Sequence, residues 1–146
     1  MWGRYRLAMV VAAVAVVVIV AALIVNRPVA FRDPPTSSLI TKNVTDDSVE
    51  MTMIITPSTQ ASHLSVVLTN EGTGSFARAN LNSTGVLQLA DGRSFLLTYG
   101  DLNGDGIASI GDTVRITGPF TPGNYSIALH FDPTAIIICK TPFEVA

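Results

Sequence analysis

Cysteine is nearly absent from this 146-residue chain: Cys139 is the only one, so no disulfide can form within the chain. Because Cys139 lies in the apolar run I-I-I-C-K, we expect a small buried hydrophobic residue, and a reactive or intermolecular thiol is the alternative. The domain is large enough to bury its own core without disulfides. In an extracellular setting, a bound ion could supply the cross-linking that disulfides give elsewhere.

The sequence also lacks the short motifs of common catalytic sites. It contains no H-E-x-x-H, no G-x-S-x-G and no glycine-rich phosphate loop. The two histidines, His63 and His130, fall within predicted strands at positions typical of surface histidines. Residues 71–75, E-G-T-G-S, have the composition of a loop between strands. We therefore expect that the protein is not an enzyme.

Positive charge is scarce in the larger part of the chain. Beyond residue 25 there are 7 basic and 11 acidic residues. No basic patch for nucleic acid is visible, and no polybasic stretch for anionic lipid headgroups. The sequence therefore predicts no nucleic-acid partner.

A long apolar run is present at the start of the chain. Residues 7–25 are 19 positions without a charge or a strongly polar side chain. About 20 such residues are needed to cross a bilayer as a helix, whereas the hydrophobic part of a secretory signal usually has about 7–15. No clean A-x-A cleavage site follows the run. We expect a single-pass transmembrane helix acting as an uncleaved signal-anchor, and a removed signal peptide is the alternative.

The sequence around this run gives its predicted orientation and the domain organisation. Basic residues are nearly balanced on the two sides, but the three N-x-S/T sequons, at Asn43, Asn82 and Asn124, all follow the run. We therefore expect the C-terminal part to be extracellular. Trp2 and Tyr5 would lie at the headgroup level as part of a cap and helix over residues 1–25. Residues 26–38, with three prolines, predict an extended linker to a domain over residues 39–146.

The most specific chemical signal is the dodecamer D-L-N-G-D-G-I-A-S-I-G-D at residues 101–112. A calcium loop of this kind needs oxygen ligands at positions 1, 3, 5, 7, 9 and 12, and glycine at position 6, here Gly106. The predicted ligands are Asp101, Asn103, Asp105, the carbonyl of Ile107, Ser109 and Asp112. The alternative is a solvated Asp/Asn/Gly turn without an ion. The sequence predicts Ca²⁺ as the only cofactor.

The surroundings of this dodecamer indicate a structural ion, not a sensor. Position 12 is Asp112 instead of the longer glutamate, and residues 94–99 and 113–117 on either side predict strands instead of helices. The ion would therefore hold a connection between two strands. Calcium modules of the weak class bind at about 10⁻⁴–10⁻³ M, which is an extracellular concentration.

The rest of residues 39–146 predicts an all-β domain. Short runs alternate between apolar and polar residues, most clearly at 49–55, 64–69 and 125–131. Asp91 and Gly92 favour a two-residue hairpin turn, and the apolar residues 135–139 predict a strand covered on both faces. About seven or eight short strands with few helical signals predict an Ig-like β-sandwich preceded by the single transmembrane helix.

The order of these motifs resembles one family. The segment Y-G-D-L-N-G-D-G-I-A-S-I-G-D-T-V-R-I, then P-G-N-Y-S-I-A-L-H-F-D-P-T and a final F-E-V, is similar to the C-terminal β-domain of archaeal type IV pilin-like surface proteins. The resemblance covers about residues 94–145. The matching positions are Asp101, Asn103, Asp105, Gly106, Gly111, Asp112, Pro122, Gly123 and Tyr125. It implies an N-terminal helix that anchors the protein or packs into a filament core, with the β-domain facing outward.

The head of the chain differs from that family, whose precursors carry a basic leader and a peptidase site before the helix. Here W-G-R-Y-R precedes Leu7, which favours a standalone anchored protein over a processed filament subunit. We expect a membrane-anchored structural or adhesive surface protein, either standalone or forming a homo-oligomer or filament. A module that binds a glycan or another cell-envelope partner is the alternative function.

Overall fold

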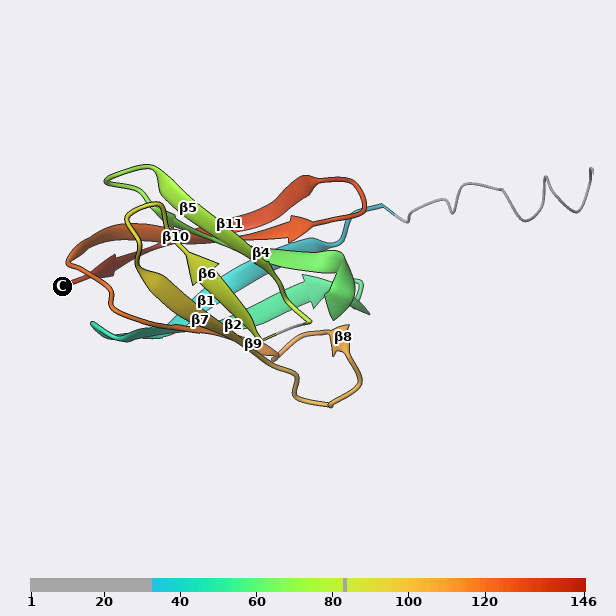
Figure 1. Cartoon of the computed structure of the whole chain (residues 1–146). Helices are drawn as coiled ribbons and strands as arrows, with labels where there is room; N and C mark the ends of the chain where they lie inside the picture. Colours follow the sequence, from blue (N-terminus) through green and yellow to red (C-terminus); the bar gives the residue numbers. More distant parts are fainter. Residues whose placement is uncertain (1–32, 83) are drawn as a thin grey trace, which may run out of the picture. The chain divides into compact units, whose positions relative to one another are not determined.

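The computed structural model describes residues 33–82 and 84–146, and these form an all-β domain as the sequence predicts (Figure 1). The domain belongs to a compact unit over residues 32–146. The predicted transmembrane helix at 7–25 and the first part of the predicted linker lie outside the described residues. Within the described residues no helix has the length and apolar character needed to cross a membrane.

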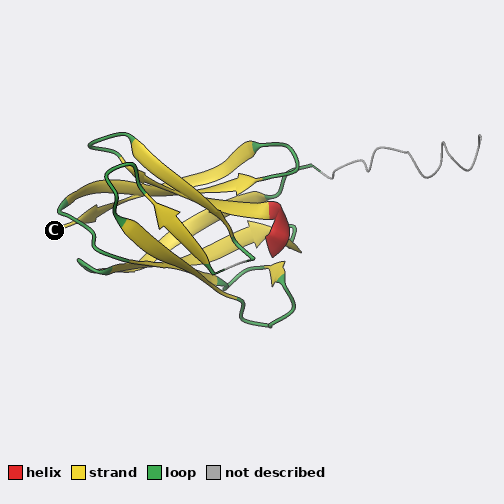
Figure 2. Ribbon diagram, viewed as in Figure 1, coloured by secondary structure: helices red, strands yellow, loops and turns green. Residues whose placement is uncertain are grey.

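Eleven strands and one short 3₁₀ helix make up the described domain (Figure 2). They are β1 (Thr36–Val44), β2 (Ser48–Thr56), β3 (Thr59–Gln60), η1 (Ala61–His63), β4 (Leu64–Asn70), β5 (Ser75–Asn80), β6 (Gly85–Gln88), β7 (Ser94–Gly100), β8 (Ile107–Ala108), β9 (Thr113–Thr117), β10 (Gly123–Phe131) and β11 (Ile136–Val145). A five-stranded sheet has the order β1-β2-β9-β7-β6, a four-stranded sheet has the order β11-β10-β4-β5, and β3 pairs with β8 alone. All strand pairs are antiparallel.

Alternating side chains explain why these segments form strands with one buried face. In β2 and β10 the apolar residues at every second position are buried, and their neighbours in β2 face outward. These buried residues are Val49, Met51, Met53, Ile55, Tyr125, Ile127, Leu129 and Phe131. The inner faces of both large sheets contribute to one hydrophobic cluster, which includes a contact group of Phe95, Phe120, Tyr125 and Phe143. The predicted alternation at 49–55 is confirmed. At 64–69 and 125–131 it is wrong, because Ser65, Val67, Ser126 and Ala128 on the other face are buried too, in the two inner strands of the four-stranded sheet.

The prediction that residues 135–139 form a strand covered on both faces is wrong. These residues lie mainly in the first half of β11, which is an edge strand paired only with β10. Ile136 and Ile137 are 46% and 55% exposed, and Cys139 is half-buried. An edge strand lacks a neighbour on one side, so part of its apolar surface stays in contact with solvent. Burial still raises the pKa of the Cys139 thiol.

Other boundaries also differ from the sequence expectation. β1 begins at Thr36, which pairs with Thr56, so residues 36–38 belong to the sheet and not to a free linker. β6 and β7 form the expected hairpin, but five residues, 89–93, join them, with Gly92 at a φ of 87°. His63 ends η1 and does not begin a strand.

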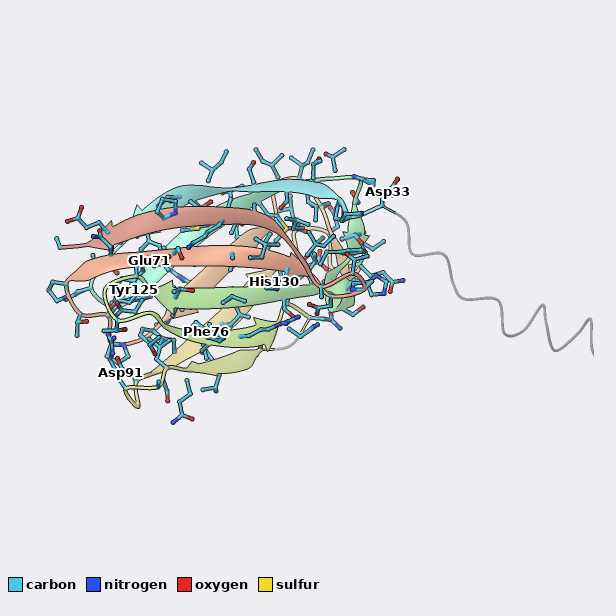
Figure 3. The ribbon with its side chains drawn as sticks, turned by 90° about the horizontal axis from the view of Figure 1, so that it is seen from above. Asp33, Glu71, Phe76, Asp91, Tyr125 and His130 are labelled. Atoms are coloured by element: carbon cyan, nitrogen blue, oxygen red, sulfur yellow. The ribbon has the colours of Figure 1, made fainter. Side chains whose placement is uncertain are left out.

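Three turns meet at the end of the domain where the described chain begins, and we call this the loop end. They are the segment from β3 to η1, the loop between β7 and β9, and the hairpin turn between β10 and β11 (Figure 1). Backbone hydrogen bonds join them: the Ala61 N–H donates to the Gly106 carbonyl at 2.9 Å, and the Asp132 N–H donates to the His63 carbonyl at 2.8 Å. The C-terminus lies at the opposite end, the far end, together with Tyr125 and Asp91 (Figure 3).

Candidate calcium loop

The predicted calcium dodecamer forms the connection between β7 and β9. Gly100 pairs with Thr113, so neighbouring strand residues open and close the loop. Within the loop, β8 pairs with β3, and the Gly111 N–H donates to the Met53 carbonyl. The flanking segments are strands, as the sequence predicts. The loop is therefore held on both sides by backbone pairing.

The Asp101 carboxylate folds back into the loop. Its Oδ1 accepts hydrogen bonds from the Asn103 N–H at 3.1 Å and the Gly104 N–H at 2.8 Å, and its Oδ2 accepts one from the Gly106 N–H at 2.7 Å. The Gly106 bond, followed by the other backbone donors, holds the pKa of Asp101 below its usual range. Gly106 has a φ of 73°, a left-handed conformation in which glycine lacks the steric cost of other residues. Asp101 thus fixes the curvature of the first half of the loop.

The Asp112 carboxylate closes the loop from inside the protein. Its side chain is fully buried, with an exposed fraction of 0%. Its Oδ1 accepts the Leu102 N–H at 3.0 Å, and its Oδ2 accepts the Tyr99 hydroxyl at 2.7 Å and the Ser109 N–H at 2.8 Å. Burial raises the pKa of Tyr99 well above its usual range, and the bond to Asp112 raises it further. Asp112 is therefore the group that ties both ends of the loop to β7.

The other predicted ligands lie between these two carboxylates. Asn103 and Asp105 are exposed, and the Asp105 Oδ1 accepts the Ile107 N–H at 2.9 Å. Ile107 lies opposite Gln60 in the short β3–β8 ladder. Ser109 is half-buried, and its hydroxyl also donates to Asp112, at 3.4 Å.

The donor chemistry of the loop fits a hard divalent cation. Every predicted ligand atom is an oxygen, and a carboxylate has about four lone-pair positions, so the hydrogen bonds described above leave acceptor capacity on Asp101 and Asp105. In the part of the chain that the structure describes, no three His, Cys, Asp or Glu side chains are grouped closely enough to hold a metal by themselves. A calcium ion here would therefore need Asn103, Ser109, backbone carbonyls or water as further ligands.

Sequence reasoning did not identify two parts of this arrangement. The sequence predicts Tyr99 only as a strand residue, but its hydroxyl donates a hydrogen bond to Asp112. A buried tyrosine hydroxyl usually finds such a partner, and its place directly before an acidic loop was the available signal. The contact between the loop and residues 59–61 had no local signal, because those residues are far away in the sequence.

The remaining candidate residues do not form a second site. His63 is half-buried and packs edge-on against Phe131, with ring centroids 6.3 Å apart. His130 is half-buried on the outer face of its sheet, and burial lowers its pKa. The asparagines of the three sequons, Asn43, Asn82 and Asn124, are all exposed.

Comparison with known proteins adds no assignment to this geometry. No protein-family model matches the chain, and no curated protein matches it.

Proposed function

We propose that this protein is a membrane-anchored extracellular structural or adhesive protein, similar to type IV pilin-like surface proteins, with a calcium-stabilised β-domain. The observation that carries the proposal is the closed loop at residues 101–112. In this loop Asp101 and Asp105 accept backbone hydrogen bonds and Asp112 accepts one from Leu102, and these carboxylate oxygens are the ligands that we propose for calcium. A site that holds two strand ends together suits a domain whose role is to stay folded outside the cell.

The strand order supports an Ig-like sandwich. In the first sheet, β1-β2-β9-β7 correspond in chain order to the Ig strands A-B-E-D, with β6 as an additional edge strand. In the second sheet, β11-β10-β4-β5 correspond to G-F-C-C′. Tyr125, near the start of β10, donates its hydroxyl to the Thr121 carbonyl at 3.1 Å and accepts a bond from Arg93 at 2.9 Å. A tyrosine at this position bonded to backbone a few residues upstream is typical of Ig-like domains.

The apolar run at residues 7–25 supports the membrane anchor, and the exposed sequon asparagines are compatible with an extracellular domain. The anchor is tested by mass spectrometry of the native N-terminus in membranes and in material sheared from the cell surface. An N-terminus at Met1 or Trp2 in membranes supports a standalone anchor, whereas a start within residues 4–8 in sheared material supports a filament subunit. A start after residue 25 would contradict the anchor.

The calcium site is tested by the thermal unfolding of the full chain in detergent micelles. At 10–100 times the dissociation constant, calcium should raise the free energy of unfolding by about 1.4–2.7 kcal/mol, because only the folded state binds the ion. We expect Asp105→Ala to lose this calcium-dependent rise. The control is Asp46→Ala, which removes an exposed carboxylate in the turn between β1 and β2 and should keep the rise. A wild-type Tm that is the same in calcium and in chelator would refute the site.

The alternative function, glycan binding, has less support. A cluster of exposed aromatic rings would favour glycan binding. Among the described aromatic residues only Phe76 is strongly exposed, at 66%. The rings of Phe95, Phe120, Tyr125 and Phe143 are instead packed together in the core. A glycan-array screen without a hit would agree with the structural function.

A further inference from the structure

The loop end of the domain carries an unusual share of exposed aliphatic side chains. Ten large hydrophobic side chains are exposed among the described residues. Five of them lie at this end of the domain, three on the loop between β7 and β9 and two at the start of β11. They are Leu102 at 73%, Ile107 at 39%, Ile110 at 63%, Ile136 at 46% and Ile137 at 55% exposure. Burying such side chains in an apolar environment is favourable, so leaving them in water has a free-energy cost. Concentration of exposed apolar groups in one region marks an interaction surface.

The chain enters the domain at this same end. Thr36 pairs with Thr56, and the next strand after Thr56, β3, pairs with β8 of the loop. Asp33 accordingly lies at the loop end, opposite Asp91 and Tyr125 (Figure 3). Only residues 26–32 separate the apolar run from Asp33. Seven residues reach at most about 25 Å even when fully extended, at about 3.3–3.6 Å each.

We propose that the loop end of the domain rests on the lipid interface, with Leu102 and Ile110 entering the boundary between headgroups and acyl chains. This inference rests on the proposed membrane anchor, because the short tether is what keeps this end near the bilayer. A strand of nine residues such as β2 is about 30 Å long at about 3.3 Å per residue, so the far end can stand away from the surface.

The charges at the loop end define the lipid that suits it. Asp105 is exposed and Asp101 is half-exposed, so the loop that carries Leu102 is acidic, and the exposed Asp33 lies at the same end of the domain (Figure 3). An acidic surface is repelled by anionic headgroups and is tolerated by zwitterionic ones, particularly when calcium neutralises the loop. A zwitterionic lipid surface is therefore the expected partner, and phosphatidylcholine serves as the probe.

A tryptophan reporter tests this contact in the full chain. The native Trp2 is first changed to phenylalanine, and Leu102→Trp is then introduced. The control chain carries Phe76→Trp in the same background, because Phe76 is similarly exposed, at 66%, but lies on β5 opposite Thr69, near the turn that joins β4 and β5. Both chains are reconstituted into phosphatidylcholine vesicles with brominated lipid, with calcium at about 10 mM so that weak sites of the 10⁻³ M class are filled.

We expect brominated lipid to reduce the emission of Leu102→Trp about twofold or more, because a side chain about 5–10 Å into the interface meets the quencher. Phe76→Trp should keep its emission. Ile110→Trp is the second reporter and should behave as Leu102→Trp does. Far-UV circular dichroism checks that each variant is folded.

Three results would overturn the inference, and they differ in what they say of the anchor. If the chain floats with the vesicles but the reporters at 102 and 110 are no more quenched than the one at 76, only the inference fails. A reporter at 102 whose emission shifts to the blue without lipid quenching means that another protein copy covers this end. If the chain does not float with the vesicles, the proposed anchor fails together with the inference.

Discussion

At the scale of single residues, the loop depends most on Asp112. Its spacing within the dodecamer predicts a calcium ligand, and the structure places it as a buried acceptor for Tyr99, Leu102 and Ser109. These donors come from the strand before the loop and from within the loop. Spacing alone could not show that, because only the folded backbone brings the donors to one carboxylate.

Replacing Asp112 with asparagine should destabilise the domain even without calcium. The amide nitrogen of asparagine cannot accept a hydrogen bond, so at least one buried donor loses its acceptor, which costs about 1–3 kcal/mol. Chemical denaturation in chelator measures this loss. Tyr99→Phe, which removes one donor and leaves the backbone bonds of Asp112 intact, should cost less, about 0.5–1.5 kcal/mol. Equal unfolding midpoints for wild type and Asp112→Asn would contradict the assigned role.

Asp101 should give the domain part of its sensitivity to acid. The pKa of its carboxyl in the folded state lies below the usual range because the N–H groups of Gly106, Gly104 and Asn103 stabilise the charged form. A lowered pKa stabilises the folded state above the unfolded-state pKa, and this contribution is lost as the pH falls through the folded-state pKa. In chelator, Asp101→Asn should therefore show a smaller fall in urea midpoint between about pH 6 and about pH 3 than wild type does.

The comparison variant for this pH series is Asp46→Asn in the exposed turn between β1 and β2. It should follow the wild-type curve. An acid profile of Asp101→Asn that coincides with wild type would show that the loop hydrogen bonds do not act through this carboxylate.

At the scale of elements, the sequence predicts the half-buried strands well and the edge strands poorly. The alternation in β2 identifies both the strand and its buried face, because one side faces the core. In β10 it identifies the strand and the side that faces the core, but Ser126 and Ala128 on the other side are buried as well. The three consecutive isoleucines at the start of β11 form an apolar run of the kind that also occurs in central strands. Whether a strand has one neighbour or two is decided by the order of strands in the sheet, which no local pattern contains. The short β3 and β8 were missed for the same reason.

The packing of β7 against the segment after β9 should be sensitive to one methyl group. A Cβ added to Gly118 would lie 2.5 Å from Cδ1 of Phe95 and 3.0 Å from the Ser94 carbonyl oxygen. Gly118→Ala should therefore destabilise the domain by about 1–3 kcal/mol through overpacking, measured by urea denaturation. Because leucine is smaller than phenylalanine, Phe95→Leu combined with Gly118→Ala should cost less than the sum of the two single changes. Strict additivity would mean that the clash does not involve the Phe95 ring.

At the scale of the whole molecule, the β-domain should fold without the N-terminal segment. Residues 32–146 form a compact unit of their own, and both sheets contribute to a single core. The contacts of β1 show which residues at the start of this unit are part of the fold. Thr36 donates its hydroxyl to the Thr56 carbonyl at 3.0 Å, and Pro35 is buried.

A chain of residues 33–146 should accordingly unfold cooperatively, as followed by circular dichroism. A chain of residues 39–146, which begins at the boundary expected from sequence, loses three paired residues of β1. We expect it to be about 1–2 kcal/mol less stable, in line with the loss of one or two net hydrogen bonds and some packing. Equal stability of the two chains would place residues 36–38 outside the folded unit.

The antiparallel β1–β2 and β10–β11 pairs have a mechanical consequence. β1 and β11 both run from the loop end to the far end, and the Thr141 hydroxyl on β11 donates to the Leu39 carbonyl on β1 at 3.0 Å. A force applied between Thr36 and Val145 pulls along the strands and not across them (Figure 1). The ladder hydrogen bonds then bear the load together in shear instead of opening one after another. The domain is thus arranged to resist tension directed along its length.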